Sequence, residues 1–325
     1  MKHIFIFIIT TPLIYLSIAF SLVFFPFERN QPEGGLDFDV LNREKLLVSS
    51  AKESHYVARD KTELFYRYIK GTSDICIVLL HGSGSEGRYL IPLASKLNEK
   101  SDITVVIPDL RGHGRSQGAM PGDVNYLGQF EHDLEDLIDH LKSSFPITRV
   151  VLGGHSSGGG LVVKYGGSSP DKFDGAVLLV PYLGYKAPTV RPNSGGWVQV
   201  AQLRYAGLAM LNNIGIKFLN SYPVLYFNRP AAVNDSLQLE SYSYRLSESF
   251  STQAYSTDLS NFKKPILLVV GELDEAVYPQ AFRDVLENNA PHAEFHILEN
   301  TQHLNLPTKE KTATLISQWL SKLFN

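Results

Sequence analysis

Short apolar runs and longer amphipathic segments alternate along most of this chain. From about residue 75 onward, each apolar run is followed by a segment with apolar residues at helical spacing. Strands buried on both faces of a sheet are apolar throughout, whereas the helices that cover the sheet are apolar on one face only. The pattern therefore predicts an α/β fold with a mostly parallel central sheet flanked by helices. The predicted strands are 75–80, 103–107, 150–153, 176–180, 266–270 and 294–298, and the predicted helices are 88–100, 127–144 and 315–324.

The N-terminal stretch is different, because residues 4–27 contain no charged side chain and are rich in Ile, Leu and Phe. At about 1.5 Å rise per residue, a helix of this length crosses a hydrocarbon core of roughly 30 Å. We therefore expect a transmembrane signal anchor within residues 1–29, which would make the membrane a partner through residues 4–27. Lys2 precedes this stretch and favours a location of the C-terminal domain on the non-cytoplasmic side. Secretion after cleavage of a signal peptide is the alternative.

The remainder of the chain divides into a linker and one domain, and the domain contains an insertion. Residues 30–52 are polar, contain Pro32, and are predicted to be a linker. Residues 53–325 are predicted to form one domain, which begins with two antiparallel strands at 54–58 and 64–69. Residues 182–258 are rich in tyrosine and contain no convincing buried strand. Because a structureless loop of that length is implausible in a compact domain, we expect a mostly helical inserted cap there.

Composition excludes several classes of function. The formal net charge is −3, with 44% hydrophobic and 19% charged residues. The sequence contains no block rich in Lys and Arg, which argues against nucleic acid as a partner. The single cysteine, Cys76, lies in an apolar run and is expected to be a buried thiol, which excludes a disulfide framework. No group of residues has metal-ligand spacing. The glycine-containing run 109–116 fits neither a P-loop nor a dinucleotide fingerprint. We expect no cofactor and no metal, and the sequence leaves the oligomeric state open.

The most informative motif is Gly-His-Ser-Ser-Gly at residues 154–158. It lies between a predicted strand and the helix-like run 159–167, which is the context of a nucleophile elbow. In such an elbow a serine is held in a strained backbone conformation, and the flanking glycines remove Cβ atoms that would clash. Ser156 is therefore the candidate nucleophile.

An activated serine needs a base to take its proton and a carboxylate to orient that base. Asp274 follows the predicted strand 266–270, and His303 follows the predicted strand 294–298. Both occur just after the carboxyl ends of strands, where open α/β sheets place their sites, and the order Ser, acid, His agrees with the motif. We therefore expect Asp274 to be the acid and His303 the base. The competing residues are Glu272 and Glu275 for the acid, and His292 and His296 for the base.

A backbone oxyanion hole is expected from two loops. The first N–H group is that of Ser157, directly after the nucleophile. The second is that of Ser83, in the glycine-containing loop that follows the strand 75–80. His81 begins this loop, and we expect its imidazole to support the loop rather than to act in catalysis.

Together these motifs resemble the α/β-hydrolase superfamily, and within it the monoglyceride lipase, lysophospholipase and serine-aminopeptidase-like branch. The resemblance rests on His81-Gly82, the run Asp-Leu-Arg-Gly-His-Gly-Arg-Ser at 109–116, the elbow, Asp274 and His303. It extends over about residues 53–323, apart from the cap. It implies that Ser156, Asp274 and His303 form a catalytic triad, with the amides of Ser83 and Ser157 as oxyanion donors. A serine at the elbow sets aside the branches whose nucleophile is a carboxylate.

The expected function is a serine hydrolase that cleaves carboxylic esters through an acyl-enzyme intermediate, with lipid-like substrates such as lysophospholipid or monoacylglycerol. The alternatives within enzymes are an aminopeptidase and an acyltransferase using the same triad. An aminopeptidase needs acidic groups in the cap to bind the substrate amine, and Glu240, Glu248 and Asp258 are the candidates. A non-catalytic binding module on the same scaffold is the alternative from a different class.

Overall fold

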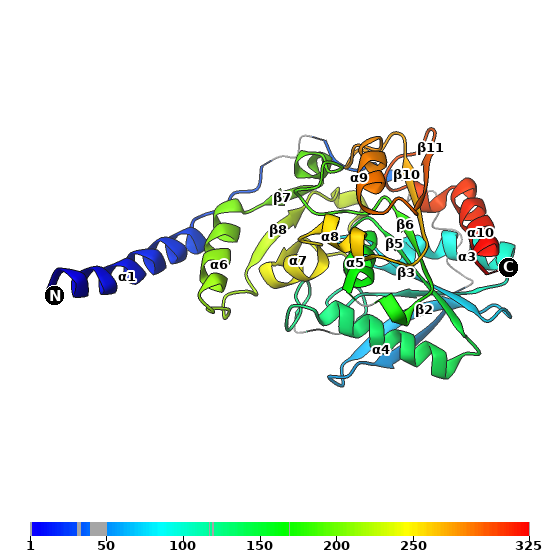
Figure 1. Ribbon diagram of the computed structural model, residues 1–325, viewed down its shortest axis with the longest axis horizontal. Helices are drawn as coiled ribbons and strands as arrows, with labels where there is room; N and C mark the ends of the chain where they lie inside the picture. The colour runs from blue at the N-terminus through cyan, green and yellow to red at the C-terminus, as the bar shows by residue number, and fades with distance from the viewer. Residues whose placement is uncertain are drawn as a thin grey trace.

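The centre of the molecule is an eight-stranded sheet with the strand order β1-β2-β4-β3-β5-β6-β10-β11 (Figure 1). The computed structural model describes residues 2–30, 34–39, 51–116, 118, 120–168 and 170–324, with side chains for all of these except 2–10 and 170. β1 pairs antiparallel with β2 and β2 with β4, and the other neighbours are parallel. The strands are β1 (Lys52–Val57), β2 (Glu63–Ile69), β3 (Ile75–Leu80), β4 (Thr104–Pro108), β5 (Arg149–His155), β6 (Gly175–Leu179), β10 (Ile266–Gly271) and β11 (Glu294–Leu298).

The central strands are buried nearly throughout, which explains why apolar runs located them. Every residue of β4, β6 and β10 is buried, as is expected for parallel strands covered on both faces. The predicted sheet and its initial antiparallel pair are confirmed, with strand ends that differ by at most a few residues. Cys76 lies in this core, and its burial raises the pKa of the thiol.

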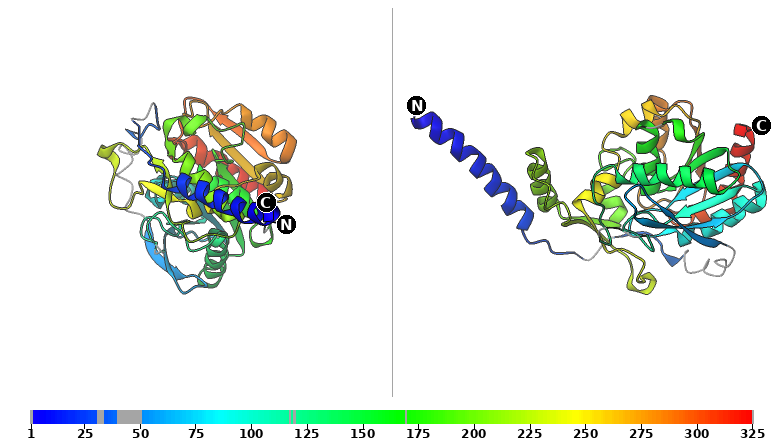
Figure 2. Two further views of the ribbon diagram at one scale, coloured as in Figure 1. Left: turned by 90° about the vertical axis from the view of Figure 1, so that its left-hand side faces the viewer. Right: turned by 90° about the horizontal axis from the view of Figure 1, so that it is seen from below.

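Helices cover both faces of the sheet (Figures 1 and 2). α3 (Ile91–Ser101) and α10 (Glu310–Phe324) pack against each other on one face. α4 (Gln129–Ser144), α5 (Ser157–Ser168) and α8 (Tyr255–Asn261) lie on the other face, and α9 (Ala281–Asn289) connects β10 to β11. The α/β-hydrolase architecture that we expected is therefore present.

The insertion between β6 and β10 differs from the predicted mostly helical cap. It contains α6 (Gln202–Asn213) and α7 (Tyr244–Phe250), but also a three-stranded antiparallel sheet of β7 (Val198–Val200), β8 (Pro223–Phe227) and β9 (Ser241–Ser243). These strands are three to five residues long, which is too short for an alternating pattern to be visible. A helical insertion was therefore only partly correct.

The chain begins with helix α1 (Lys2–Phe24). Among the helices that the structure describes, none is both long and apolar enough to cross a bilayer. The single-pass anchor expected over residues 4–27 is therefore not supported. Part of that expectation rests on residues 1–10, whose side chains lie outside the described residues.

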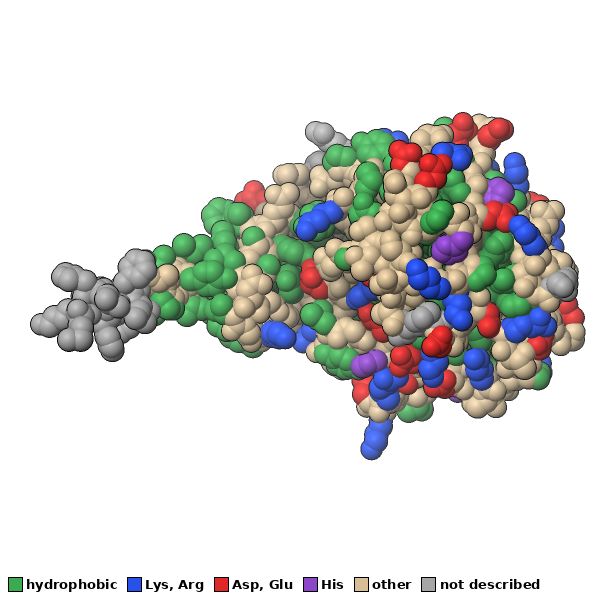
Figure 3. Space-filling model, in the orientation of Figure 1, with side chains coloured by type: hydrophobic (Ala, Val, Ile, Leu, Met, Phe, Trp, Pro, Cys, Tyr) green, Lys and Arg blue, Asp and Glu red, His purple; other side chains and the backbone are tan. Residues whose placement is uncertain are grey.

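The second half of α1 packs against α6 of the insertion. Ala19 and Val23 are fully buried there, and the Tyr15 hydroxyl donates a hydrogen bond to the Met210 carbonyl at 2.9 Å. The two helices approach closely at Gly207, where an added Cβ atom would lie 2.6 Å from the Ala19 carbonyl oxygen. On its outer side α1 exposes apolar side chains, and hydrophobic side chains form a green region on the left of Figure 3, next to the grey atoms. The exposed residues of α1 are Leu13, Ile14, Ile18 and Phe24, and Phe25 directly after the helix is also exposed.

The predicted linker over residues 30–52 is described only in part, because residues 31–33 and 40–50 lie outside the described residues. Its described portion is packed rather than free. Phe38 is buried against Trp197, with ring centroids 5.4 Å apart, and the backbone N–H of Asp37 donates to Glu275. This segment therefore contacts the insertion and the loop that carries Asp274.

We expect Gly207→Ala to destabilise the protein, although alanine is the better helix former by about 1 kcal/mol. The reason is that the new methyl group meets the backbone of α1, and overpacking of this kind costs about 1–3 kcal/mol. Chemical denaturation measures the change in the free energy of unfolding. Asn213→Ala, at the exposed end of the same helix, is the control and should change stability little. An increase in stability for Gly207→Ala would contradict the close approach of the two helices.

Candidate active site

The elbow places Ser156 in the sharp turn between β5 and α5. Ser156 has a φ of 54°, a left-handed conformation that is rare for a residue with a side chain. The neighbouring glycines make this turn possible. A Cβ atom on Gly154 would lie 2.4 Å from the backbone of Gly158, and one on Gly158 would lie 2.5 Å from the Leu80 carbonyl oxygen. The steric reason for this motif, which we inferred from the sequence, is therefore visible in the structure.

Asp274 and His303 meet beyond the carboxyl ends of β10 and β11. Their side chains are joined by a hydrogen bond of 2.8 Å between His303 Nδ1 and Asp274 Oδ2, and both residues are almost completely buried. The other carboxylate oxygen of Asp274 accepts hydrogen bonds from the backbone N–H groups of Ala276 and Val277. Because an ionised carboxylate can only accept, Nδ1 of His303 carries a proton. This leaves Nε2 as the basic nitrogen of the neutral ring.

Asp274 and His303 each shift the pKa of the other in the direction that favours its charged form. Burial alone would lower the pKa of His303, but the charge and hydrogen bond of Asp274 outweigh it and raise that pKa. Burial would likewise raise the pKa of Asp274, whereas His303 and the two backbone N–H groups lower it. Asp274 is therefore an anion that stabilises the protonated form of His303.

The competing residues lie elsewhere. Glu272 is exposed and accepts from the backbone N–H of Asn300. Glu275 accepts from the backbone N–H of His303, so it helps to hold the histidine loop. His292 contacts the Lys264 carbonyl at the surface, and His296 pairs with Glu294 on β11.

In the loop after β3, the backbone N–H groups of Gly82 and Gly84 donate hydrogen bonds, whereas that of Ser83 between them donates none within the described part of the chain. The Gly82 N–H donates to the Tyr89 hydroxyl at 2.8 Å, and the Gly84 N–H donates to the Tyr242 hydroxyl at 2.7 Å. Among the described residues, no hydrogen bond uses the Ser83 N–H. Ser157 is the first residue of α5, so its N–H has no acceptor within the helix. Ser83, Ser156 and Ser157 line one cavity.

His81 and the run 109–116 have structural contacts. His81 donates from Nδ1 to the Gly82 carbonyl and accepts the Leu110 N–H at Nε2. Asp109 pairs with Arg67 and accepts the backbone N–H groups of Gly87 and Arg115. The run therefore helps to fix the loop beside Ser156.

A tyrosine that we did not single out from the sequence connects three loops of the site. His155 Nε2 lies 3.1 Å from the His303 carbonyl oxygen, so Nε2 must carry the proton and donate. Nδ1 of His155 then accepts from the Tyr89 hydroxyl at 2.9 Å, which itself accepts the Gly82 N–H. Burial, followed by the nearby His303, lowers the pKa of His155 to about 3, so the ring stays neutral. We name this chain, Gly82–Tyr89–His155–His303, the loop-linking network.

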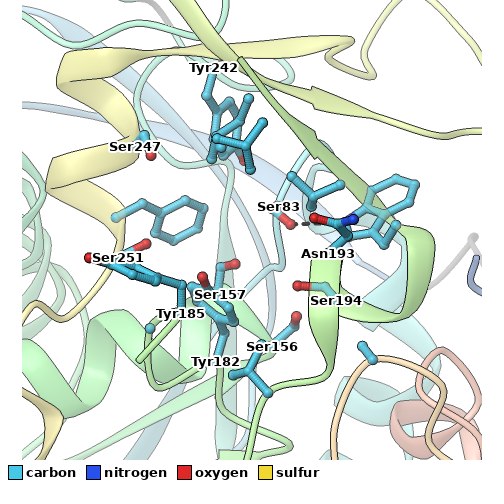
Figure 4. Close-up of a pocket in the computed structure, with 18 of the residues that line it drawn as sticks. Ser83, Ser156, Ser157, Tyr182, Tyr185, Asn193, Ser194, Tyr242, Ser247 and Ser251 are labelled. Atoms are coloured by element: carbon cyan, nitrogen blue, oxygen red, sulfur yellow. Dashed lines mark hydrogen bonds between the residues drawn. The ribbon is translucent and has the colours of Figure 1, made fainter. Parts of the chain in front are cut away.

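A cavity of about 600 Å³ opens between the sheet and the insertion, and Ser156 and His303 are among its lining residues. Figure 4 shows Ser156 in this cavity. This volume is typical of sites for small organic ligands. Its walls are largely apolar and come from β7, β8, α6 and α7. The main apolar contributors are Val198, Val200, Tyr205, Leu225, Phe227 and Phe250.

No Asp or Glu is among the described residues that line this cavity. Glu240 is exposed directly before β9. Glu248 accepts a hydrogen bond from the Tyr205 hydroxyl, and Asp258 accepts one from the Thr252 hydroxyl. None of the three acidic residues considered for binding a substrate amine therefore reaches the cavity. The described residues also contain no cluster that could hold a metal ion.

Comparison with known proteins agrees with this geometry. Residues 71–310 match the family described as Hydrolase_4, serine aminopeptidase, S33. Monoglyceride lipase from Rattus norvegicus is 33% identical over 135 residues, which are 40% of this chain and 43% of that protein. Proline iminopeptidase from Saccharolobus solfataricus is 37% identical over 97 residues, 30% of each chain. The matched regions therefore span less than half of these curated relatives.

A solved structure of similar fold is the monoacylglycerol lipase of Paleococcus ferrophilus. It superposes with a TM-score of 0.58 at 21% sequence identity, covering 80% of this chain and 99% of that one. At this identity the likeness concerns the fold, which is that of the α/β hydrolases. Because the family match covers well over half of the sequence, the chain belongs to the S33 serine aminopeptidase (Hydrolase_4) family.

Proposed function

We propose that this protein is a serine hydrolase that cleaves carboxylic esters with an apolar acyl chain through an acyl-enzyme intermediate. In this proposal Ser156 is the nucleophile, His303 the general base and Asp274 the acid that orients it. The backbone N–H groups of Ser83 and Ser157 are the oxyanion donors. The family relation and the monoglyceride lipase relatives support a hydrolase of this type.

The chemistry follows the protonation states of the site. Ser156 Oγ attacks the ester carbonyl while its proton passes to Nε2 of His303, and the carbonyl oxygen becomes an oxyanion held by two N–H groups. Asp274 stabilises the imidazolium that forms. The C–O bond then breaks, and His303 returns the proton to the leaving alcohol. A water molecule, deprotonated by His303, attacks the acyl-enzyme, and the acid is released as Ser156 regains its proton.

The single observation that carries the choice of ester over peptide is the lining of the cavity. Recognition of a free amino terminus calls for a carboxylate near the scissile bond, since a buried ammonium group is costly without one. The described lining contains none, whereas apolar side chains of β7, β8 and α7 surround the space above Ser156. An acyl chain gains roughly 0.8 kcal/mol for each CH₂ group buried in such a space. Monoacylglycerols and lysophospholipids are esters of this kind.

The test compares p-nitrophenyl esters of increasing chain length with aminoacyl anilides, after labelling with a fluorophosphonate probe. We expect labelling, and a kcat/KM for esters that rises with chain length until the cavity is filled. A preference for anilides would overturn ester cleavage and favour the aminopeptidase alternative, to which the iminopeptidase relative belongs by name. Transfer of the acyl group to an added alcohol in preference to water would favour an acyltransferase. Failure of the protein to react with the probe would overturn the serine nucleophile.

We expect Tyr89→Phe to lower kcat by about 10–100-fold, with little change in KM. The substitution removes the hydroxyl that accepts the Gly82 N–H and donates to His155, so the oxyanion loop is less well positioned. Loss of an entire oxyanion donor costs about 10²–10³-fold, and a misplaced donor should cost less. Steady-state kinetics on a soluble ester checks this, and Tyr56→Phe, whose hydroxyl bonds the Asp133 carbonyl away from the site, is the matched control. Equal losses in both variants would contradict a specific role for the loop-linking network.

A further inference from the structure

One segment of the insertion has an unusual backbone. Asn193, Ser194, Gly195 and Gly196 have φ values of 51°, 49°, 65° and 93°. Left-handed conformations normally occur as single residues and not as runs. Such a run persists only when the surrounding structure imposes it, and strained segments cluster at functional sites.

The segment is held against the loop that follows Asp274. A Cβ atom on Gly195 would lie 1.9 Å from the Glu275 carbonyl oxygen, so this contact admits only glycine. The backbone N–H of Arg191 donates to the Ala276 carbonyl at 3.0 Å, and Trp197 N–H closes the turn on the Ser194 carbonyl. Packing beside the candidate acid therefore fixes the turn.

The turn presents polar side chains to an otherwise largely apolar cavity. Asn193 and Ser194 line it together with Ser156 (Figure 4). Arg191 also lines the cavity, and no other Arg and no Lys, Asp or Glu is among the described residues of the lining. The long apolar wall on β7, β8 and α7 suits the acyl chain, so this polar part is available for the remaining polar portion of a substrate.

Neighbouring residues fix the orientation of the Arg191 side chain, but no carboxylate of the described residues neutralises its charge. Its Nε donates to the Val277 carbonyl at 2.7 Å, and its guanidinium lies over the Tyr278 ring at 4.4 Å. No carboxylate of the described residues forms an ion pair with it. The two terminal amino groups of a guanidinium fixed in this way match the geometry of an anionic oxygen pair.

We propose that Arg191, Asn193 and Ser194 form a binding site for an anionic group, a phosphate or a carboxylate, carried by the ester substrate. This inference rests on the proposed esterase function and deepens it. A phosphate would belong to the alcohol portion of a lysophospholipid, whereas a carboxylate would belong to the acyl portion. Arg191 supplies the charge, and the Asn193 amide and the Ser194 hydroxyl supply further hydrogen bonds.

The experiment measures kcat/KM of the full chain on two matched pairs of esters, below their micellar concentrations. The first pair is 1-dodecanoylglycerol and its 3-phosphate, and the second is p-nitrophenyl butyrate and p-nitrophenyl hemisuccinate. We expect the wild type to prefer the anionic member of one pair, which identifies the source of the anion. Arg191→Gln should lower kcat/KM for that ester at least 10-fold and leave its neutral partner within about twofold. The preference should also decrease with ionic strength.

Two further variants keep the outcome interpretable. Arg191→Lys retains the charge and should retain part of the preference, even if Arg191→Gln disturbs the adjacent Asp274 loop. Arg283→Gln removes an exposed cation that lies over the Phe295 ring, and neither residue lines the cavity; this control should change neither pair. Equal losses on neutral and anionic esters in both Arg191 variants, or no loss at all, would overturn the anion site while leaving the esterase proposal intact. Absence of hydrolysis of any ester would overturn the proposed function and this inference with it.

Discussion

Ester hydrolysis by a Ser156→Ala variant is expected to be about 10⁴-fold slower or more, and labelling by a fluorophosphonate should be lost. Without Oγ no acyl-enzyme forms, and what remains is the modest rate enhancement that binding and an oxyanion hole supply on their own. The φ of 54° at this position is equally unfavourable for alanine and serine. The variant should therefore fold like the wild type, which thermal unfolding checks.

The matched control for this prediction is Ser157→Ala. Ser157 is the next residue and lines the same cavity, but the proposal uses only its backbone N–H. Its hydroxyl is therefore dispensable, and activity should remain within a few-fold of the wild type. Labelling that survives in Ser156→Ala but disappears in Ser157→Ala would show that Ser157, and not Ser156, is the nucleophile.

Asp274→Asn is expected to lower kcat by about 10³–10⁴-fold, the second largest effect. The amide can donate to Nδ1 of His303, which places the ring proton on Nε2, where it blocks uptake of the serine proton. The loss should appear in kcat rather than in KM, because Asp274 contacts His303 and not the cavity. Glu272→Gln, two residues away and exposed, is the control and should be nearly neutral.

The pH dependence of the same variant provides a second measurement. His303 must be neutral to act as a base, so the rate increases with pH through its pKa, which Asp274 raises above the usual 6.5. Without the carboxylate, burial is the dominant influence and lowers that pKa. The ascending limb of the residual kcat/KM should therefore move to lower pH in Asp274→Asn. A limb that stays in place would mean that another group sets the pKa of His303.

The sheet and the candidate triad could be predicted because the local sequence determines both. Parallel strands buried on both faces are apolar throughout, and Asp274 and His303 directly follow two of them. The glycines around Ser156 indicate a sharp turn, because side chains at these positions would clash with the neighbouring backbone. The elbow, Asp274 and His303 each follow the carboxyl end of a parallel strand, and in the structure these strand ends lie at the same edge of the sheet.

The insertion could not be predicted to the same depth, because its conformation depends on distant contacts. The left-handed turn at Asn193 and Ser194 is imposed by packing of Gly195 on Glu275, some eighty residues later. Tyr89 looks like an ordinary residue near the start of a helix, and its role emerges only from the positions of Gly82 and His155. The N-terminal stretch was recognised as apolar, but its pattern gave no indication that Gly207 is its packing partner.

The contact of α1 with α6 connects the second half of the N-terminal helix to one wall of the cavity. One side of α6 carries Gly207 against α1, while Tyr205 and Ala206 of the same helix line the cavity. Under the proposed function the acyl chain would also lie against α6, so we expect a displacement of α1 to shift part of the wall around it. We therefore expect a tether, fusion partner or antibody that binds α1 to change the chain-length preference of the proposed esterase, at a distance from Ser156 and without contact with the substrate.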